Sequence, residues 1–356
     1  MSRHEIDDRV IDVVDGVVRR IRQAASSLGG VVQLDAREEL NRRMMSTGWR
    51  PSGRASAGGS CQLLPTTDGR WIALNLARPD DVESLPALFE TEFGPIDGII
   101  PWSDVARCVA SSEALVVRQR GIDLGMPVAI VGEVDATGEI LEIENRGVGD
   151  EFDDLRSLKV VDLSSMWAGP LVGRVLTSLG SRVMKIESTS RPDGARQGPV
   201  DFFAALNADK ELRSFDFRNR GDVDELRRSI TDADVVIEAS RPRALVQLGI
   251  DRDEIMRSSS VRAWLSVTAH GRSGTDALRV GFGDDAAAAG GLVGHTDDGP
   301  EFIGDAIADP ITGLVGAMAV LETLLSGRRN TIDVSLARSA AHVAASARET
   351  SLSASH

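Results

Sequence analysis

The second half of the chain, from residue 158 onward, alternates strand-like apolar runs with helix-like segments. The runs are continuously rich in Val, Ile and Leu, which is typical of strands buried on both faces of a parallel sheet. Such a sheet needs helices on both faces, and the intervening segments have the apolar periodicity of helices. The runs are LKVVDLS, SRVMKIE, DADVVIEAS and RAWLSVT. We therefore predict a Rossmann-like α/β domain, a parallel sheet with helices on both faces, over residues 151–356.

Two further parts are predicted ahead of this domain. Residues 1–50 carry apolar side chains at helical spacing and are predicted to form a helical arm. Residues 51–150 are predicted to form a smaller α+β domain, with a Gly-rich loop and a β-hairpin around Asp68-Gly69. The loop is either a linker or a mobile flap over a site. We expect the acidic segment 136–155 to be the domain boundary; the alternative is a hairpin of the small domain.

Charge and cysteine content restrict the class of function. The formal charge of −14 argues against nucleic acid or an anionic membrane as the main partner. The two cysteines, Cys61 and Cys108, form neither a disulfide framework nor a metal-ligand spacing. With no signal-like apolar N-terminus, this composition predicts a cytoplasmic protein. No apolar run approaches the ~20 residues that a membrane span needs, and the absence of Tyr removes phenolic acid–base chemistry.

The loops after the predicted strands are the places to look for a ligand, because parallel α/β sheets bind ligands beyond the carboxyl ends of their strands. In this acidic chain several of these loops carry arginine or lysine. Each cation alone is most simply a solvated charge, whereas together they favour a phosphate-bearing ligand across the sheet edge. A nicotinamide cofactor is disfavoured because the first turn lacks G-x-G-x-x-G, although Glu187 ends the second strand. The cations are Arg191, Arg196, Lys210, Arg218, Arg220, Arg241 and Arg243.

The Gly-rich segment after the last of these strands contains further ionisable side chains. His270 lies in a predicted turn and is either simply exposed or functional. Asp284 and Asp285 begin an Ala-rich helix, so we expect them to cap it.

The stretch EFIGDAIADPITGLVGAMAVLETLL, residues 301–325, places a carboxylate between a short apolar run and a long apolar helix. Asp309 is followed by Pro310 and Gly313, which we expect to open that helix. One interpretation is an ordinary helix cap. The other is a nucleophile, since helix-start amides would keep the carboxylate anionic and a partly enclosed carboxylate can attack a carbonyl.

Seven segments occur in one order over about residues 157–345: VVDLSSMWAGPLVGRVLTSLGSRVMKIE, RPDGAR, FFAALNADK, ADVVIEASRPRALVQLGI, SVTAHGRSGTDALR, GDAIADPITGL and GRRNTIDVSLARSA. Together they resemble the family III CoA-transferases, which include formyl-CoA and carnitine-CoA transferases and the related α-methylacyl-CoA racemases. The resemblance implies that Asp309, followed by Gly313, is the catalytic aspartate. It also implies CoA contacts by Met166, Trp167, Ala168, Arg191, Asn207, Lys210, Arg220, Ala239, Ser240, Arg241 and Arg243.

The chain departs from the family pattern in three respects. Racemases place a histidine opposite the aspartate, and Phe282 or Gly283 stands there instead. Because racemisation needs a base on each side of the α-carbon, this weighs against it. Trp167 replaces a glutamine of formyl-CoA transferase, which weighs against oxalate- or formate-like substrates. Finally, GGSCQLLPTTDGRWIALNL and RQRGIDLGMPVAIVGEV resemble the family's small domain but precede the large one, as in a circular permutation; the flap would then be Gly58, Gly59 and Ser60.

By this resemblance the protein moves CoA from an acyl-CoA thioester to a carboxylic acid. Asp309 would form a mixed anhydride and then an aspartyl-CoA thioester, and the amides of Gly58 and Gly59 would stabilise developing oxyanions. Acyl-CoA is then a substrate, and no permanently bound cofactor or metal is expected. We expect a homodimer with intertwined arms and no nucleic-acid or membrane partner. The alternatives are an acyl-CoA racemase or isomerase, a non-catalytic acyl-CoA-binding protein, and a half-enzyme that needs a partner chain.

Overall fold

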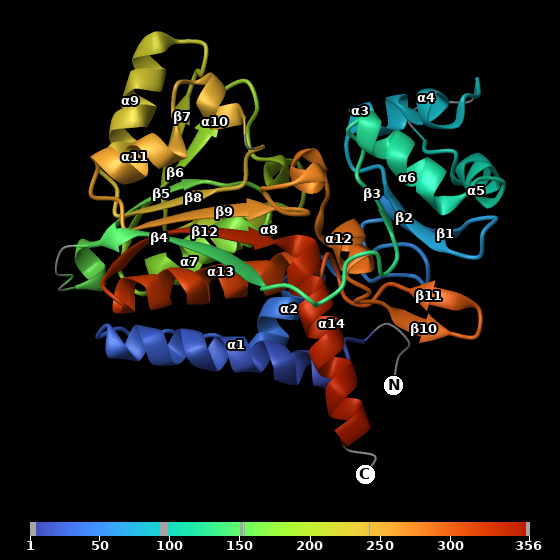
Figure 1. Ribbon diagram of the computed structural model, residues 1–356, viewed down its shortest axis with the longest axis horizontal. Helices are drawn as coiled ribbons and strands as arrows, with labels where there is room; N and C mark the ends of the chain where they lie inside the picture. The colour runs from blue at the N-terminus through green and yellow to red at the C-terminus, as the bar shows by residue number, and fades with distance from the viewer. Residues whose placement is uncertain (1–4, 93–98, 150–151, 153, 242, 354–356) are drawn as a thin grey trace.

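A seven-stranded sheet forms the centre of the computed structural model (Figure 1). The structure describes residues 5–92, 99–149, 152, 154–241 and 243–353, and for residues 351–353 it describes the backbone only. The strand order is β4-β12-β9-β8-β5-β6-β7. Neighbouring strands are parallel, except that β4 runs antiparallel to β12. The strands are β4 (Leu141–Val148), β5 (Lys159–Leu163), β6 (Arg182–Ser188), β7 (Glu211–Phe215), β8 (Val235–Glu238), β9 (Ala263–Thr268) and β12 (Arg328–Ser335).

Helices cover both faces of this sheet, which confirms the predicted α/β class (Figure 1). On one face lie α7 and α13, with α1 as a further layer beneath α13. The opposite face is covered by α9, α10 and α11. The central strands are therefore enclosed on both sides, and every residue of β8 is buried. The helices are α1 (Asp8–Ser27), α7 (Ala168–Ser178), α9 (Arg220–Thr231), α10 (Ala244–Gln247), α11 (Arg252–Ser258) and α13 (Ala308–Leu325).

The central helix of the molecule is α13. By length and composition it could cross a membrane, but 83% of its span is buried inside the protein. Its Gly313 allows a close approach to α7, because a Cβ there would lie 2.7 Å from the carbonyl oxygen of Ala168. Since α13 ends just before β12 begins, its first turn lies at the opposite edge of the sheet, where the parallel strands have their carboxyl ends.

A smaller unit packs beside the large sheet (upper right in Figure 1). It is an antiparallel sheet of β1 (Cys61–Pro65), β2 (Trp71–Asn75) and β3 (Val128–Ile130). The predicted hairpin is confirmed, with Pro65 opposite Trp71 across the Asp68-Gly69 turn. Short helices complete its separate apolar core, namely α3 (Pro79–Glu83), α4 (Leu85–Phe89), α5 (Trp102–Ala110) and α6 (Ala114–Asp123).

The predicted domain boundary is wrong in one respect. The segment 136–155 contains β4, which pairs with β12 and so belongs to the large sheet. Its pattern is weak because β4 is an edge strand with mostly exposed or half-buried side chains. The junction at residues 150–151 lies outside the described residues.

The remaining elements include a helix between the two units and the N-terminal arm. Helix α12 packs against both β2 and α14, so it lies between the small unit and the large one. The arm consists of α1 and α2, which pack on α13 instead of projecting freely. The bounds are α2 (Ala36–Thr47), α8 (Val200–Asn207), α12 (Gly283–Ala289), α14 (Leu336–Ser353), β10 (Gly294–Thr296), β11 (Gly299–Glu301) and the 3₁₀ turns Leu155–Ser157, Gly194–Gln197 and Thr275–Leu278.

Candidate active site

Asp309 lies inside the first turn of α13 rather than before it. The helix begins at Ala308, and Ile307 occupies the cap position without a side-chain capping bond. The interpretation of Asp309 as an ordinary helix cap is therefore wrong. Its side chain is partly exposed, and its carboxyl meets the turn that begins α12.

The turn that precedes Asp309 has a strained backbone. Ala306 has a φ of 44°, in the left-handed region that non-glycine residues seldom adopt. Its N–H donates to Asp284 Oδ1 at 2.9 Å, and its carbonyl accepts from the Asp309 N–H at 2.9 Å. Asp305 is fully buried and paired with Arg43, whose Nε donates to Asp305 Oδ2 at 2.6 Å. These contacts hold a costly conformation directly beside the candidate nucleophile.

A second turn, Gly281 to Gly283, closes over Asp309 from the start of α12. A Cβ at Gly283 would lie 2.3 Å from Asp309 Oδ2 and 2.4 Å from the carbonyl oxygen of Ala306. Only glycine fits at this position, which therefore cannot carry the base of a racemase. The Gly283 N–H interacts with the Asp309 carboxyl and lowers its pKa.

Three carboxyl groups and one guanidinium determine the electrostatics of this site. Burial raises the pKa of Asp309 to about 7; Asp284 and Asp305 add to the rise, while Arg43 and the Gly283 N–H oppose it. Burial also raises the pKa of Asp284 to about 6. The expectation that the helix start keeps Asp309 fully anionic is thus wrong, because burial beside two other carboxyl groups outweighs the helix-start amides.

Arg43 is the functional residue that sequence reasoning missed. It projects from α2, and its guanidinium lies 5.2 Å from the ring centre of Trp167 and 5.6 Å from that of Phe202. The two rings contact each other edge to face at 4.8 Å. No local pattern in the arm marks Arg43, since its partner Asp305 is 262 positions away in the sequence. The Asp284-Asp285 doublet was visible in the sequence, but its role as more than a cap was not.

The loop after β5 has the second strained position of the site. Met166 has a φ of 70°, and its N–H donates to Asp193 Oδ1 at 2.9 Å. Trp167 and Ala168 are buried and belong to the core. Of the three predicted CoA contacts in this loop, only Met166 keeps exposed surface.

Lys210 and Asn207 are structural in this conformation. The Lys210 ammonium donates to Asp162 Oδ2 at 2.8 Å, to the Pro170 carbonyl at 2.8 Å and to Asn207 Oδ1 at 2.9 Å. Its three protons are used and the residue is buried, so none remains for a phosphate oxygen. Asn207 is buried and donates to the Phe203 carbonyl at 3.0 Å.

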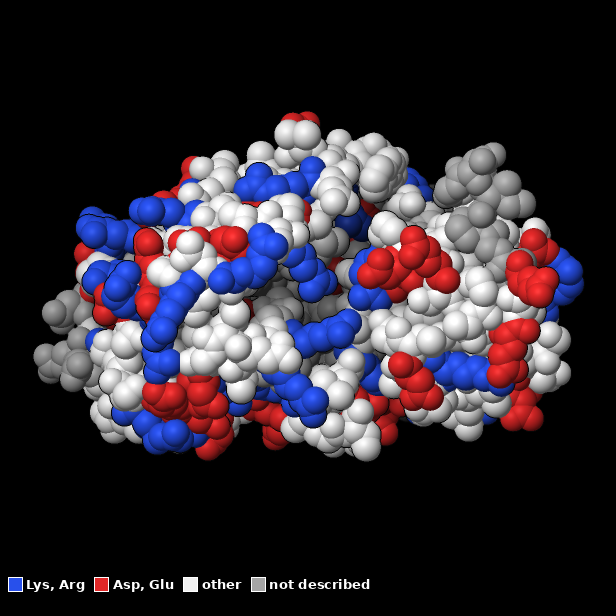
Figure 2. Space-filling model, turned by 90° about the horizontal axis from the view of Figure 1, so that it is seen from above, with Lys and Arg blue, Asp and Glu red and all other residues white. Residues whose placement is uncertain are grey.

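The other predicted CoA contacts lie on the surface. Ser240 is half-buried and donates to Glu238 at 2.7 Å. Exposed are Arg191, Arg220, Ala239, Arg241 and Arg243. Seen from above, the molecule is hollowed between its two units, and Lys and Arg side chains gather around the hollow (Figure 2). A basic surface of this kind suits a phosphate-bearing ligand in spite of the net charge of −14.

Gly58 and Gly59 lie exposed in the loop that leads into β1. The Gly59 N–H donates to the Ser56 carbonyl at 2.8 Å, so in this conformation it is not available to an oxyanion. The loop is tied to the large unit through the Gly53 carbonyl, which accepts from the Phe302 N–H at 2.9 Å.

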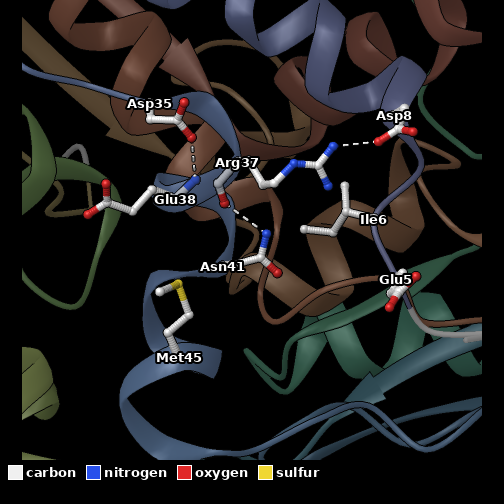
Figure 3. A pocket seen from close by; sticks show the side chains of 8 residues that line it. All are labelled: Glu5, Ile6, Asp8, Asp35, Arg37, Glu38, Asn41 and Met45. Atoms are coloured by element: carbon white, nitrogen blue, oxygen red, sulfur yellow. Dashed lines mark hydrogen bonds and ion pairs between the residues drawn. The ribbon is translucent and has the colours of Figure 1, made fainter.

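A cavity of about 440 Å³ lies elsewhere, between α2 and the chain before α1 (Figure 3). Its lining is acidic, and Arg37 is paired with Asp8. This charge does not suit a phosphate-bearing ligand. The lining residues are Glu5, Ile6, Asp8, Asp35, Arg37, Glu38, Asn41 and Met45.

The half of the chain that contains Asp309 matches a known protein family. A model of CoA-transferase family III matches residues 155–355. The chain belongs to CoA-transferase family III. The crystal structure of a CAIB/BAIF family protein from Brucella suis is similar, with 31% sequence identity and a TM-score of 0.52 over 57% of this chain and 58% of that chain.

Two relatives indicate the chemistry of the family. A probable fatty acyl-CoA transferase of Mycobacterium tuberculosis is 31% identical over 188 residues, which cover 49% of this chain and 48% of the relative. Succinyl-CoA:glutarate CoA-transferase of Mus musculus is 27% identical over 190 residues, which cover 51% of this chain and 44% of the relative. This family III member therefore spans about half the length of the curated relatives it matches.

The raised carboxyl pKa values predict how stability depends on pH. Asp285, beside Asp284, has its pKa raised to about 7 by burial, from an ordinary value of 3.8. The folded protein then holds this proton more tightly than the unfolded chain does, so the contribution of Asp285 to the free energy of unfolding falls between about pH 4 and 7. We expect Asp285→Asn to be more stable than wild type at pH 8, by about 1 kcal/mol or more, and similar to it at pH 4.

Urea unfolding at several pH values measures this difference between variant and wild type. The exposed Asp297, in the turn between β10 and β11, provides the control variant Asp297→Asn, which makes the same chemical change at the surface. If the free energy of unfolding depended on pH equally in Asp285→Asn and wild type, the pKa of Asp285 would not be raised in the folded protein.

Proposed function

We propose that this family III protein catalyses CoA transfer from an acyl-CoA thioester to a carboxylic acid, with Asp309 as the nucleophile. The observation that carries the proposal is the Asp309 carboxyl itself. The residue keeps some exposed surface at the carboxyl edge of the sheet, while burial of its carboxyl raises the pKa to about 7 against the influence of the Gly283 N–H. A carboxylate of raised pKa is a stronger nucleophile once ionised, and near pH 7 a substantial fraction is ionised.

The reaction is a sequence of acyl exchanges at Asp309. The Asp309 carboxylate attacks the donor thioester carbonyl, a mixed anhydride forms and CoA leaves as the thiolate. The thiolate then attacks the aspartyl carbonyl, which gives an aspartyl-CoA thioester and releases the donor acid. The acceptor carboxylate attacks this thioester to form a second anhydride, and the returning thiolate takes the acceptor acyl group and frees Asp309.

The chain's own residues support these steps. The Gly283 N–H brings positive charge to the reacting carboxyl. Arg43 opposes the rise in the Asp309 pKa. The basic rim of the hollow in Figure 2 provides an electrostatic setting for CoA phosphates.

We further propose that residues before 155 supply the family's small domain in permuted order. The small unit precedes the family-matched half in the chain and packs against α12 beside Asp309. A cytoplasmic homodimer with intertwined arms remains part of the proposal. Light scattering of the purified chain measures the oligomer, and its activity without added protein distinguishes a complete enzyme from a half-enzyme.

Trapping the intermediate tests the proposed function. After incubation with an acyl-CoA and then hydroxylamine, mass spectrometry should find a hydroxamate on the Asp309 peptide. Its yield should rise with pH through about 7, as Asp309 ionises. Modification absent from Asp309 with every acyl-CoA that the protein binds would support a binding protein instead. Solvent deuterium appearing at the α-carbon without an acceptor acid would support a racemase.

A further inference from the structure

Asp285 is a fully buried carboxyl group for which the proposed chemistry has no use. Its Oδ1 accepts two hydrogen bonds, from the Phe282 N–H at 3.0 Å and from Asn75 Nδ2 at 2.9 Å. Phe282 belongs to the turn over Asp309, whereas Asn75 ends β2 of the small unit. One oxygen atom therefore binds a donor from each of the two units.

The turn held by Asp285 contacts the nucleophile directly. Gly283 follows Phe282 and leaves no space for a Cβ beside Asp309 Oδ2, and its N–H lowers the pKa of Asp309. The adjacent Asp284 holds the other turn, through its bond to the Ala306 N–H. Two consecutive carboxyl groups thus fix the backbone on both sides of Asp309.

The second oxygen of Asp285 and the His270 ring both lie close to Gly281. Asp285 Oδ2 lies 2.7 Å, and His270 Nε2 3.3 Å, from the point where Gly281 would carry a Cβ. His270 is buried, contrary to the expectation of an exposed turn, and neither ring nitrogen has a hydrogen-bond partner among the described residues. Burial, with Arg279 and Arg118 nearby, lowers the pKa of His270 to about 3, so the ring is neutral at working pH. Arg78 lies close enough to interact electrostatically with Asp285, whereas the contacts of Asp285 with the turn and with β2 are hydrogen bonds.

We propose that Asp285 is a positioning residue: through Asn75 and the Phe282 N–H it couples the docking of the small unit to the contact between Gly283 and Asp309. A shift of the small unit would move Asn75, then the Asp285 carboxyl, and then the turn that donates to the nucleophile. The consequence for CoA transfer rests on the proposed function above, whereas the consequence for the ionisation of Asp309 does not.

A second contact between the units provides a matched control. Arg279 of the large unit donates to the Val128 carbonyl at 3.2 Å and pairs with Glu133 just after β3. Glu133 makes no contact with Asp309 or its two turns among the hydrogen bonds and ion pairs of the described residues. Glu133→Gln therefore weakens docking in general without removing an atom next to the turn.

The test compares Asp285→Leu, Asp285→Asn, Asn75→Leu and Glu133→Gln in the full chain. Asp285→Leu removes the acceptor and should lower kcat for CoA transfer about 10- to 100-fold, with the KM for acyl-CoA within about twofold. Asp285→Asn keeps an acceptor oxygen for both donors and should stay within about threefold of wild type. Asn75→Leu should lower kcat in the same way as Asp285→Leu but less, and Glu133→Gln should leave it unchanged.

The ionisation of Asp309 provides a readout that needs no substrate. In carboxyl-¹³C aspartate NMR, assigned by difference with Asp309→Asn, displacement of the Gly283 N–H from the Asp309 carboxyl should raise the Asp309 midpoint by about half a pH unit or more. This should occur in Asp285→Leu and Asn75→Leu, and not in Asp285→Asn or Glu133→Gln. If Asp285→Leu does not fold, Asn75→Leu decides the question by the same two measurements.

Two results would overturn the proposal. One is an unchanged Asp309 midpoint in folded Asp285→Leu and Asn75→Leu. The other is a Glu133→Gln variant that loses as much kcat as Asn75→Leu, which would indicate general docking. A wild-type protein without CoA transfer would refute the proposed function alone, because the NMR midpoints would still decide whether Asp285 positions the turn.

Discussion

Asp309→Asn is expected to abolish CoA transfer, with a fall in kcat of at least about 10³-fold. An amide at this position cannot form the mixed anhydride, although its size keeps the contacts with the two surrounding turns. The protein should remain folded and be at least as stable at pH 8, since the wild-type carboxyl must ionise there against its raised pKa of about 7. Exchange of labelled CoA between an acyl-CoA and its acid, together with urea unfolding, measures both effects.

Asp297→Asn is the matched control, since it makes the same chemical change at an exposed carboxyl. It should transfer CoA as wild type does. Transfer that survives Asp309→Asn would place the nucleophile elsewhere, whatever the family resemblance.

The second large effect is expected for Arg43→Met. This change leaves Asp305, which is fully buried, without its cation, and breaking a buried pair in this way costs about 3–5 kcal/mol of unfolding free energy. It also removes the guanidinium that opposes the rise in the Asp309 pKa. The pH dependence of CoA transfer should therefore move upward, with the greatest loss of rate near pH 7 and partial recovery at higher pH.

Urea unfolding and a pH–rate profile separate the two consequences. Arg37→Met makes the same change on the same helix, in an exposed pair with Asp8. It should change neither the free energy of unfolding nor the pH–rate profile by much. The double variant Arg43→Met/Asp305→Asn should recover part of the lost stability, because no unpaired carboxylate remains. A pH–rate profile that stays at its wild-type position in Arg43→Met would show that Arg43 acts on stability alone.

The fold of the large unit follows from features that are local in the sequence. Runs such as those around Val235 and Trp264 are mostly apolar because both faces of their strands are covered by helices. The Asp68-Gly69 hairpin is likewise specified by two residues. The edge strand β4 was missed because an exposed strand carries no continuous apolar run, and only its pairing with β12 identifies it.

The site was only partly predictable. Asp309 was identified because its neighbours along the chain, Pro310 and Gly313, mark a helix start that matches a family segment. The roles of Lys210 and Asn207 were misjudged, because a buried lysine and a surface lysine look alike in sequence. His270, expected in an exposed turn, is enclosed beside Asp285 and Gly281.

By itself, the sequence determined the α/β class, the hairpin, the helix that carries Asp309 and the family segments around it. These depend on periodicity and on residues close together in the chain. Only the tertiary structure decided the ionisation of Asp309, since burial, Asp284, Asp305 and Arg43 contribute to it from three separate parts of the chain. Electrostatic interactions depend on distance and on exclusion of water, and neither quantity is encoded in local sequence spacing.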